Sequence, residues 1–124
     1  MSSAPVVLVV DDDESILEFI GMALSDEGYE VVLAQHGQNA LDLILVGKVS
    51  PDLILLDVRM PVMGGEEFLR AYNEIPGPSA PIIAVTATRD SVGDGLSIDA
   101  DGVLAKPFDL EELLDVVNRY TRRR

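Results

Sequence analysis

The sequence contains no cysteine among its 124 residues, so it can form neither a disulfide bond nor a thiolate metal site. It also lacks any apolar run that approaches the ~20 residues needed to cross a bilayer. The N-terminus does not show the basic and then apolar pattern of a secretory signal. Together these absences predict a cytoplasmic protein without a membrane-spanning segment.

Basic residues are scarce, since the chain has 9 Lys and Arg against 22 Asp and Glu, for a net charge of -13. Because duplex binding requires a basic face that displaces counterions, we expect no direct nucleic-acid binding by this domain. Three of the basic residues, Arg122, Arg123 and Arg124, stand at the C-terminal end. They either complement the dipole of a final helix or begin a linker to a further domain.

The overall composition is that of a soluble globular protein, with 48% hydrophobic and 25% charged residues. A chain of this length fits one domain, which we expect over residues 1–124 with a core at about 5–121. Apolar runs alternate with amphipathic stretches, a pattern typical of βα repeats around a parallel sheet. Five strands are expected, at residues 6–10, 31–34, 53–57, 81–85 and 102–105.

About five helices should connect and follow these strands. The spacing of apolar residues predicts helices at about 16–24, 40–45, 66–72 and 110–120. Gly28 and Gly47 should end the first two, and Asp109 should cap the last. The remaining helix, within 89–101, contains two glycines that each cost about 1 kcal/mol relative to Ala, so we expect it to be short or mobile.

Acidic residues follow two of the most apolar strands. The run at 53–56 reads as a strand buried on both faces and ends at Asp57, while the run at 6–10 ends at Asp11–Asp13. In an open α/β sheet, ligands bind at the carboxyl ends of the strands. Two strands that place acids at the same edge indicate a compact site for a hard cation and a phosphoryl group. Asp13 is better placed to cap the following helix.

Four motifs stand in order at the predicted strand ends: VLVVDDDES at 7–15, PDLILLDVRMP at 51–61, PIIAVTA at 81–87 and GVLAKPF at 102–108. With these motifs the chain resembles the receiver domain of two-component response regulators over nearly its whole length. The resemblance implies an α/β fold of the flavodoxin-like, doubly wound type. That fold is a (βα)5 sandwich with a five-stranded parallel sheet of strand order 2-1-3-4-5.

By this resemblance, Asp57 is the phosphoacceptor, which takes its phosphoryl group from a sensor histidine kinase or a histidine phosphotransfer protein. Asp11 and Asp12, together with Asp57 and the backbone carbonyl of Arg59, match the ligands of Mg²⁺ (or Mn²⁺). The three carboxylates face only one positive side chain, Lys106, and a divalent cation would bring their formal sum to zero. The metal would also offset charge on the phosphoryl oxygens during transfer.

The resemblance gives Lys106 a contact with the phosphoryl oxygens and gives Thr86 the hydroxyl that changes position. Phosphorylation replaces one negative charge by about two, so the site must recruit a further donor. The hydroxyl of Thr86 and the amide of Ala87 are the candidates. Their movement would displace the loop after the fourth strand and shift the population of surface states. We therefore expect a downstream protein partner on the face between the fourth strand and the fifth helix.

The chain departs from the family pattern at two places. Three residues before Lys106, where the family usually carries Tyr or Phe, it has Val103. The loop usually written M-P-x-M-D-G reads MPVMGG at 60–65. Both changes indicate an unusual partner surface beside the fourth and fifth strands, and neither alters the acceptor chemistry.

Two other functions stay open at this point. Asp11, Asp13 and Ser15 satisfy the D-x-D-x-[S/T] pattern of haloacid-dehalogenase-like phosphatases, in which the first Asp is the nucleophile and the second the general acid. That interpretation leaves Asp57 without a role and the chain without a cap domain. A receiver-like adaptor that works without phosphate is the other alternative. The main interpretation is a signalling module, not a turnover enzyme, which catalyses only its own phosphorylation and dephosphorylation.

Overall fold

The computed structural model describes residues 4–47, 49–58, 65–75, 80–86 and 100–121. Within these residues the chain forms one sheet of five parallel strands, β1 (Val6–Val10), β2 (Glu30–Ala34), β3 (Leu53–Asp57), β4 (Ile82–Thr86) and β5 (Gly102–Ala105). Their order across the sheet is β2-β1-β3-β4-β5. The predicted fold class and strand order are therefore confirmed.

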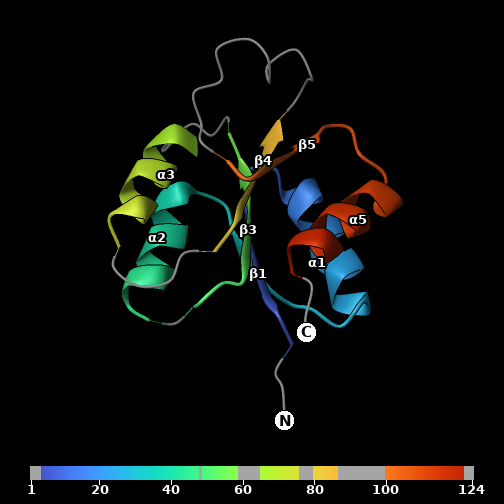
Figure 1. The fold of residues 1–124 in the computed structure, drawn as a ribbon, viewed down its shortest axis with the longest axis horizontal. Coiled ribbons are helices and arrows are strands. Elements are labelled where there is room, and N and C mark those ends of the chain that lie inside the picture. The colour runs from blue at the N-terminus through green and yellow to red at the C-terminus, as the bar shows by residue number, and fades with distance from the viewer. Residues whose placement is uncertain (1–3, 48, 59–64, 76–79, 87–99, 122–124) are drawn as a thin grey trace.

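The described part of the chain also contains four helices, α1 (Glu14–Asp26), α2 (Gly37–Leu45), α3 (Gly65–Asn73) and α5 (Leu110–Tyr120). The helix expected within 89–101 falls mainly on residues 87–99, which lie outside the described residues. Figure 1 shows the sheet edge-on, with α2 and α3 on one face and α1 and α5 on the other. The connections that contain α1 and α2 therefore cross over opposite faces of the sheet, as the parallel pairing of the strands they join requires.

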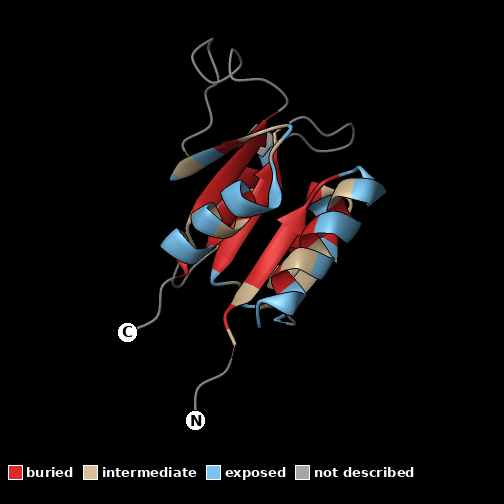
Figure 2. Cartoon of the chain, turned by 90° about the vertical axis from the view of Figure 1, so that its right-hand side faces the viewer, coloured by how far each residue is buried: buried red, intermediate tan, exposed pale blue. Residues whose placement is uncertain are grey.

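Each face of the sheet has its own hydrophobic core, which explains the unbroken apolar run of β3. Leu53 and Leu55 pack with the residues of α1 and α5, whereas Ile54 and Leu56 pack with those of α2 and α3. All four side chains are fully buried, and Figure 2 shows the central strands buried along their length. Burial of one such side chain stabilises the fold by roughly 1.5–3 kcal/mol. Because both faces are covered, β3 must be apolar until it reaches the edge where Asp57 stands.

The ends of the helices follow the predicted capping residues. The carboxylate of Asp13 accepts hydrogen bonds from two backbone amides in the first turn of α1. Asp109 and Glu112 form a capping box at the start of α5. Gly28 and Gly47 follow α1 and α2 with φ of 93° and 78°, the left-handed conformation in which a glycine commonly ends a helix. These local signals fix where each helix begins or ends before any long-range packing is considered.

His36, which the sequence predicts to be a loop residue, occupies the N-cap position of α2. Within the part of the chain that the structure describes, its side chain makes no capping hydrogen bond and its buried Nδ1 atom has no partner. Asn is among the preferred N-cap residues because its side-chain oxygen accepts a bond from the first-turn amides. We expect His36→Asn to raise the free energy of unfolding by about 0.5–1 kcal/mol, measured by urea denaturation.

Asp109→Ala serves as the opposite control, since it removes a cap that is already formed, and should lower the free energy of unfolding by about 0.5–2 kcal/mol. A His36→Asn variant less stable than the parent chain would show that the imidazole contributes packing that outweighs the missing cap.

Candidate functional site

Asp11 is the first acid of the site and stands directly after β1. Its backbone amide donates a hydrogen bond of 3.1 Å to the carbonyl oxygen of Ala34, which extends the pairing of β1 with β2 by one residue. Its side chain is almost completely buried, and its Oδ1 atom accepts a 2.9 Å bond from the amide of Asp13. Two backbone contacts therefore fix the position and the orientation of this carboxylate.

Asp57, the second buried acid, is the last residue of β3. Val10 of β1 pairs with Leu56, so the next residues of the two strands, Asp11 and Asp57, emerge side by side at the same edge. The amide of Val58 donates a 3.2 Å bond to the carbonyl oxygen of Val85 and thereby continues the pairing with β4. Asp57 is only 5% exposed, so its carboxylate lies inside the fold and not on an open surface.

Asp12 completes a group of three carboxylates. One oxygen of each of Asp11, Asp12 and Asp57 lies within 4.8 Å of the other two. Asp12 is exposed whereas the other two are buried, so the group is accessible from the side of Asp12. Carboxylate oxygens are the donors that Mg²⁺ prefers, and few of them suffice because this ion keeps several waters. The residues present therefore fit a hard divalent cation. The fourth predicted ligand, the backbone carbonyl of Arg59, lies outside the described residues.

Lys106 brings a positive charge to these acids from the end of β5. Its Nζ atom lies 3.1 Å from Oδ2 of Asp11 and 3.8 Å from Oδ2 of Asp57. The Lys106 side chain is 22% exposed, which leaves it in contact with both solvent and the buried carboxylates. The peptide bond between Lys106 and Pro107 is cis. A cation between two buried acids compensates part of the cost of removing them from water.

Thr86, the last residue of β4, lies at the same edge. It is 1% exposed and pairs in register with Ala105 of β5. Its carbonyl oxygen accepts a 2.7 Å hydrogen bond from the amide of Lys106, so the ends of β4 and β5 are joined at the site. The structure thus brings Asp11, Asp12, Asp57, Thr86 and Lys106 to one sheet edge. Ala87, the remaining predicted residue, lies outside the described residues.

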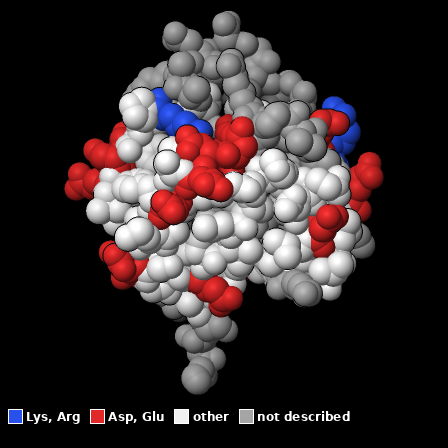
Figure 3. All heavy atoms as spheres, turned by 180° about the vertical axis from the view of Figure 1, so that it is seen from behind, with Lys and Arg blue, Asp and Glu red and all other residues white. Residues whose placement is uncertain are grey.

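The charge of this edge is strongly negative. Figure 3 views the molecule from the side opposite to Figure 1 and shows acidic side chains gathered in one patch that borders a basic side chain. Three carboxylates and one ammonium leave the group two charges negative in formal terms. A site of this kind attracts a divalent cation and, once the cation is bound, tolerates the oxygens of a phosphoryl group.

One feature of the site region was not predicted from the sequence. Phe19 is one of the apolar residues whose spacing predicts the helix at 16–24, but its side chain is 41% exposed. It lies with Ile16, Pro107 and Phe108 in a shallow pocket of about 310 Å³ that also includes Lys106. The rings of Phe19 and Phe108 are 6.2 Å apart. In the sequence, the only indication of this exposure is that Phe19 is a bulky apolar residue at the edge of the apolar stripe of α1.

Comparison with known proteins identifies the class. The model of the family described as "Response regulator receiver domain" matches residues 7–118. The chain therefore belongs to the response regulator receiver domains, the modules of two-component signalling that work with a kinase or phosphotransfer partner. None of the helices that the structure describes has the length and apolar character needed to cross a membrane.

Individual relatives agree with this assignment. The chain is 46% identical over 120 residues to response regulator MprA of Mycolicibacterium vanbaalenii, a match that covers 94% of this chain and 50% of that protein. It thus spans about half the length of the curated relatives it matches. The structure is similar to chemotaxis response regulator CheY4 of Vibrio cholerae, with a TM-score of 0.83 and 36% identity over 95% of this chain and 99% of the other. A putative response regulator of Chloroflexus aurantiacus gives a TM-score of 0.85 at 32% identity, covering 98% of this chain and 100% of the other.

The three carboxylates predict that Mg²⁺ stabilises the folded chain, because only the folded state brings them together. At a Mg²⁺ concentration about 100 times its dissociation constant, the free energy of unfolding should rise by about 2.7 kcal/mol. Asp12→Asn and Asp57→Asn should each reduce this gain, since each removes one ligand charge. The gain is measured as the shift of the urea unfolding curve on adding Mg²⁺ at constant ionic strength.

Asp26→Asn, an equivalent change at an exposed position at the end of α1, is the matched control and should retain the full gain. Equal stabilisation of all four proteins by Mg²⁺ would place the ion elsewhere.

Proposed function

We propose that this chain is a phosphoacceptor module in which Asp57 takes a phosphoryl group from a phosphohistidine. The donor is a sensor histidine kinase or a histidine phosphotransfer protein, and the phosphorylated state changes the binding of a downstream protein. The observation that carries the proposal is the buried carboxylate of Asp57 with Asp11 and Asp12 within 4.8 Å and the Lys106 ammonium 3.8 Å away. The chain is modified once per transfer and does not turn over a substrate.

The transfer is a single displacement at phosphorus. A carboxylate oxygen of Asp57 forms the new P–O bond while the P–N bond of the donor phosphohistidine breaks, and the histidine leaves with the electron pair of that bond. Mg²⁺ (or Mn²⁺), held by Asp11, Asp12 and Asp57 with the carbonyl of Arg59, would supply charge compensation for the phosphoryl oxygens. Lys106, which already lies between two of the acids, can follow those oxygens and neutralise them further.

Asp11 is the nucleophile that a dehalogenase-like phosphatase would use. Its Oδ1 atom accepts a hydrogen bond from the amide of Asp13, and its Oδ2 atom pairs with Lys106. These two contacts hold the carboxylate of Asp11 in place beside Asp57, which supports an orienting and metal-binding role for Asp11.

Phosphorylation adds about one negative charge to a site whose positive charge is already used. The hydroxyl of Thr86 and the amide of Ala87 are the donors proposed to compensate it. Because the amide of Lys106 is bonded to the carbonyl oxygen of Thr86, a displacement of Thr86 also pulls on the end of β5. The chemistry at Asp57 can therefore reach the surface formed by β5 and α5 through a population shift.

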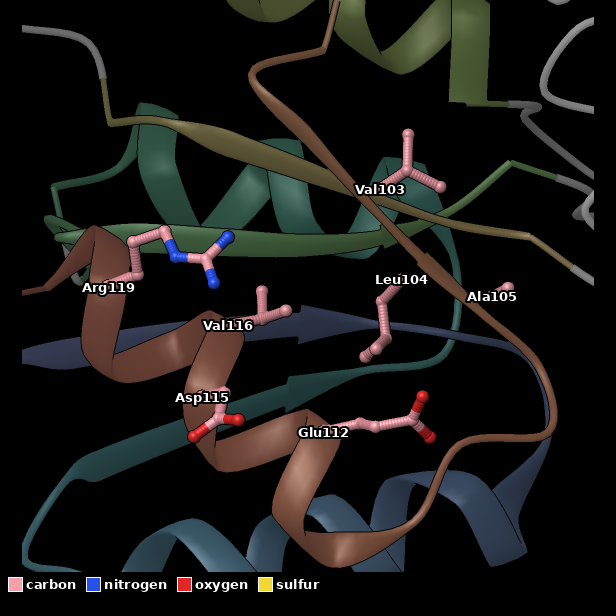
Figure 4. A pocket seen from close by; sticks show the side chains of 7 residues that line it. All are labelled: Val103, Leu104, Ala105, Glu112, Asp115, Val116 and Arg119. Carbon is pink, nitrogen blue, oxygen red and sulfur yellow. The ribbon is translucent and has the colours of Figure 1, made fainter.

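The proposed surface for the downstream partner lies between the fourth strand and the fifth helix. Figure 4 shows its described part, a hollow of about 500 Å³ lined by Val103, Leu104 and Ala105 of β5 and by Glu112, Asp115, Val116 and Arg119 of α5. Val103 is 40% exposed and offers no ring at the position where the resemblance leads us to expect Tyr or Phe. Recognition of the phosphorylated state by the downstream partner would then depend on the position of β5 and not on the rotation of an aromatic ring.

The proposed surface for the phosphodonor is the apolar pocket beside Lys106. Exposed Phe19 and the partly buried Phe108 and Ile16 give this pocket, which also includes Lys106, an apolar lining. A donor that docks there places its histidine close to the end of β3. A kinase or phosphotransfer protein would bind to this pocket, whereas a small phosphodonor would react with Asp57 without contacting it.

Incubation with acetyl phosphate and Mg²⁺ should add one phosphoryl group to the chain, seen by intact-mass spectrometry. Asp57→Asn should abolish the addition, and Lys106→Met should reduce the phosphorylated fraction because the phosphoryl oxygens lose a positive partner. Chelation of the divalent cation should have the same effect as removing Asp57. Labelling that persists in Asp57→Asn, or no labelling of the parent chain, would favour the phosphatase or the phosphate-independent adaptor.

Phe19→Ala should slow phosphotransfer from a histidine kinase about tenfold, the effect of losing about 1.4 kcal/mol of docking energy. The same variant should react with acetyl phosphate at the parent rate. The measurement is the rate of transfer from the purified, radiolabelled kinase domain.

Leu45→Ala is the matched control, because Leu45 is a 63% exposed apolar residue on α2, on the other face of the sheet. If both variants slow transfer equally, or if Phe19→Ala has no effect, the donor docks elsewhere.

A further inference from the structure

The start of β5 is held to two neighbouring elements, at the end of the strand that lies away from the phosphoryl site. The backbone amide of Asp101 donates a 2.8 Å hydrogen bond to the carbonyl oxygen of Ile82, and the amide of Ile82 donates a 2.8 Å bond to Oδ2 of Asp101. The carbonyl oxygen of Asp101 accepts a 2.9 Å bond from the hydroxyl of Tyr120, in the last turn of α5. We call these three hydrogen bonds the clamp, because they join the starts of β4 and β5 to the end of α5.

Gly102, the first residue of β5, lets the clamp close tightly. A Cβ atom at this position would lie 2.8 Å from Cδ1 of Ile83 and 2.9 Å from the hydroxyl oxygen of Tyr120. Both distances are shorter than those of real Cβ contacts, so glycine is required where the tyrosine approaches the backbone this closely. The side chain of Tyr120 therefore holds the start of β5 by direct packing as well as by its hydrogen bond.

The other end of β5 lies at the charged site. There the amide of Lys106 donates a 2.7 Å bond to the carbonyl oxygen of Thr86, and the Lys106 side chain lies against Asp11 and Asp57. Five residues separate Lys106 from Asp101, a distance of about 16 Å along an extended strand. A change of charge at the site thus acts on one end of β5 while the clamp holds the other.

We propose that β5 pivots about the clamp when Asp57 is phosphorylated, a movement that rests on the function proposed above. In this movement Asp101 and Tyr120 are positioning residues, because they fix the end of β5 about which the rest turns. A strand that is pulled at one end and fixed at the other moves in proportion to the distance from its fixed end. Ala105, four residues from Asp101, therefore moves about twice as far as Val103, which is two residues from it.

The pivot divides the proposed surface for the downstream partner into two parts. In Figure 4, Arg119 lies on the side where β5 begins and Glu112 on the side where it ends at Ala105. The hollow therefore changes shape near Glu112 and keeps its shape near Arg119. A partner gains affinity for the phosphorylated state only through contacts that differ between the two states. Contacts near Glu112 therefore distinguish the states, whereas contacts near Arg119 bind both equally.

Tyr120→Phe tests the clamp in the unmodified chain, because it removes the hydroxyl bond and keeps the ring. Hydrogen exchange at the backbone amides of Ile82 and Asp101 should become about fivefold faster, the factor that one hydrogen bond of ordinary strength contributes to a local opening equilibrium. Both amides donate within the clamp, so they report its opening directly.

Tyr29→Phe is the matched control. The hydroxyl of Tyr29 also contacts the last part of α5, where its partners are Asn118 and the hydroxyl of Thr121, and these contacts do not reach β5. Exchange at Ile82 and Asp101 should therefore stay at the parent rate in this variant.

The movement is followed by NMR of the uniformly ¹⁵N-labelled chain with Mg²⁺ and beryllium fluoride, which takes the place of a phosphoryl group on Asp57. In the parent chain the change in amide chemical shift should be largest at Lys106 and should decrease along β5. At Gly102 it should be about one fifth of the change at Lys106. In Tyr120→Phe the change at Gly102 should increase, whereas Tyr29→Phe should give the parent pattern.

A second pair of variants opens the clamp from the side of β4. Asp101→Ala removes the acceptor of the Ile82 amide and should also increase the change at Gly102. Asp101→Asn should restore the parent pattern, because its side-chain oxygen can still accept that amide.

Changes of equal size at Gly102 and Lys106 in the parent chain would overturn the proposal, because β5 would then move as a whole. The same pattern in the parent, Tyr120→Phe and Asp101→Ala would also overturn it, since the clamp would then play no part. If beryllium fluoride causes no change at Asp57 or Lys106, the proposed function itself fails and the pivot fails with it.

Discussion

Two carboxylates buried side by side with a single ammonium are the constraint on which this structure depends. A charge removed from water is costly unless partners compensate it. Asp11 is 2% exposed and Asp57 5%, and both lie within reach of Lys106. The parallel register of β1 and β3 forces the two acids together, and β5 delivers the compensating cation. Because the compensation is incomplete, the site suits a divalent ion, and the proposed phosphoryl group on Asp57 would upset the balance again.

The strand order determines which parts of the sheet adjoin this charged site. β4 and β5 lie on one side of β3, and they are joined at their ends by the hydrogen bond from Lys106 to Thr86. We therefore propose that a change at Asp57 acts first on β4 and on β5, the strand that carries Val103. β2 lies at the opposite edge, beyond β1. On our proposals, the surface beside β5 reports the phosphorylation state.

Much of the fold could be predicted because its signals are local. The unbroken apolar runs of β1 and β3 reflect burial on two faces, and Asp109, Gly28 and Gly47 mark helix ends through contacts within a few residues. Membership of the family and the order of the strands followed from four motifs at strand ends. The same signals predicted that the acids lie together, because the carboxyl ends of parallel strands meet at one edge of the sheet.

The rest depends on contacts between distant segments. Phe19 fits the apolar stripe of α1, but a helical pattern does not say where the neighbouring elements stop covering that stripe, and the side chain is 41% exposed. His36 gave no capping signal, because an imidazole is not a preferred cap, yet it occupies the N-cap position of α2. The 3.1 Å approach of Lys106 to Asp11 depends on the register of β4 with β5 and on the pairing of β1 with β3, which no short segment encodes.

The central claim is that one side chain, selected by burial and by its charged neighbours, accepts the phosphoryl group. Borohydride reduction of the phosphorylated chain converts an aspartyl phosphate to homoserine, and peptide sequencing by mass spectrometry then locates the modified residue. The account predicts homoserine at position 57 alone. Homoserine at position 11 or 12, or a phosphoryl group that resists reduction because it sits on a hydroxyl or an imidazole, would contradict it.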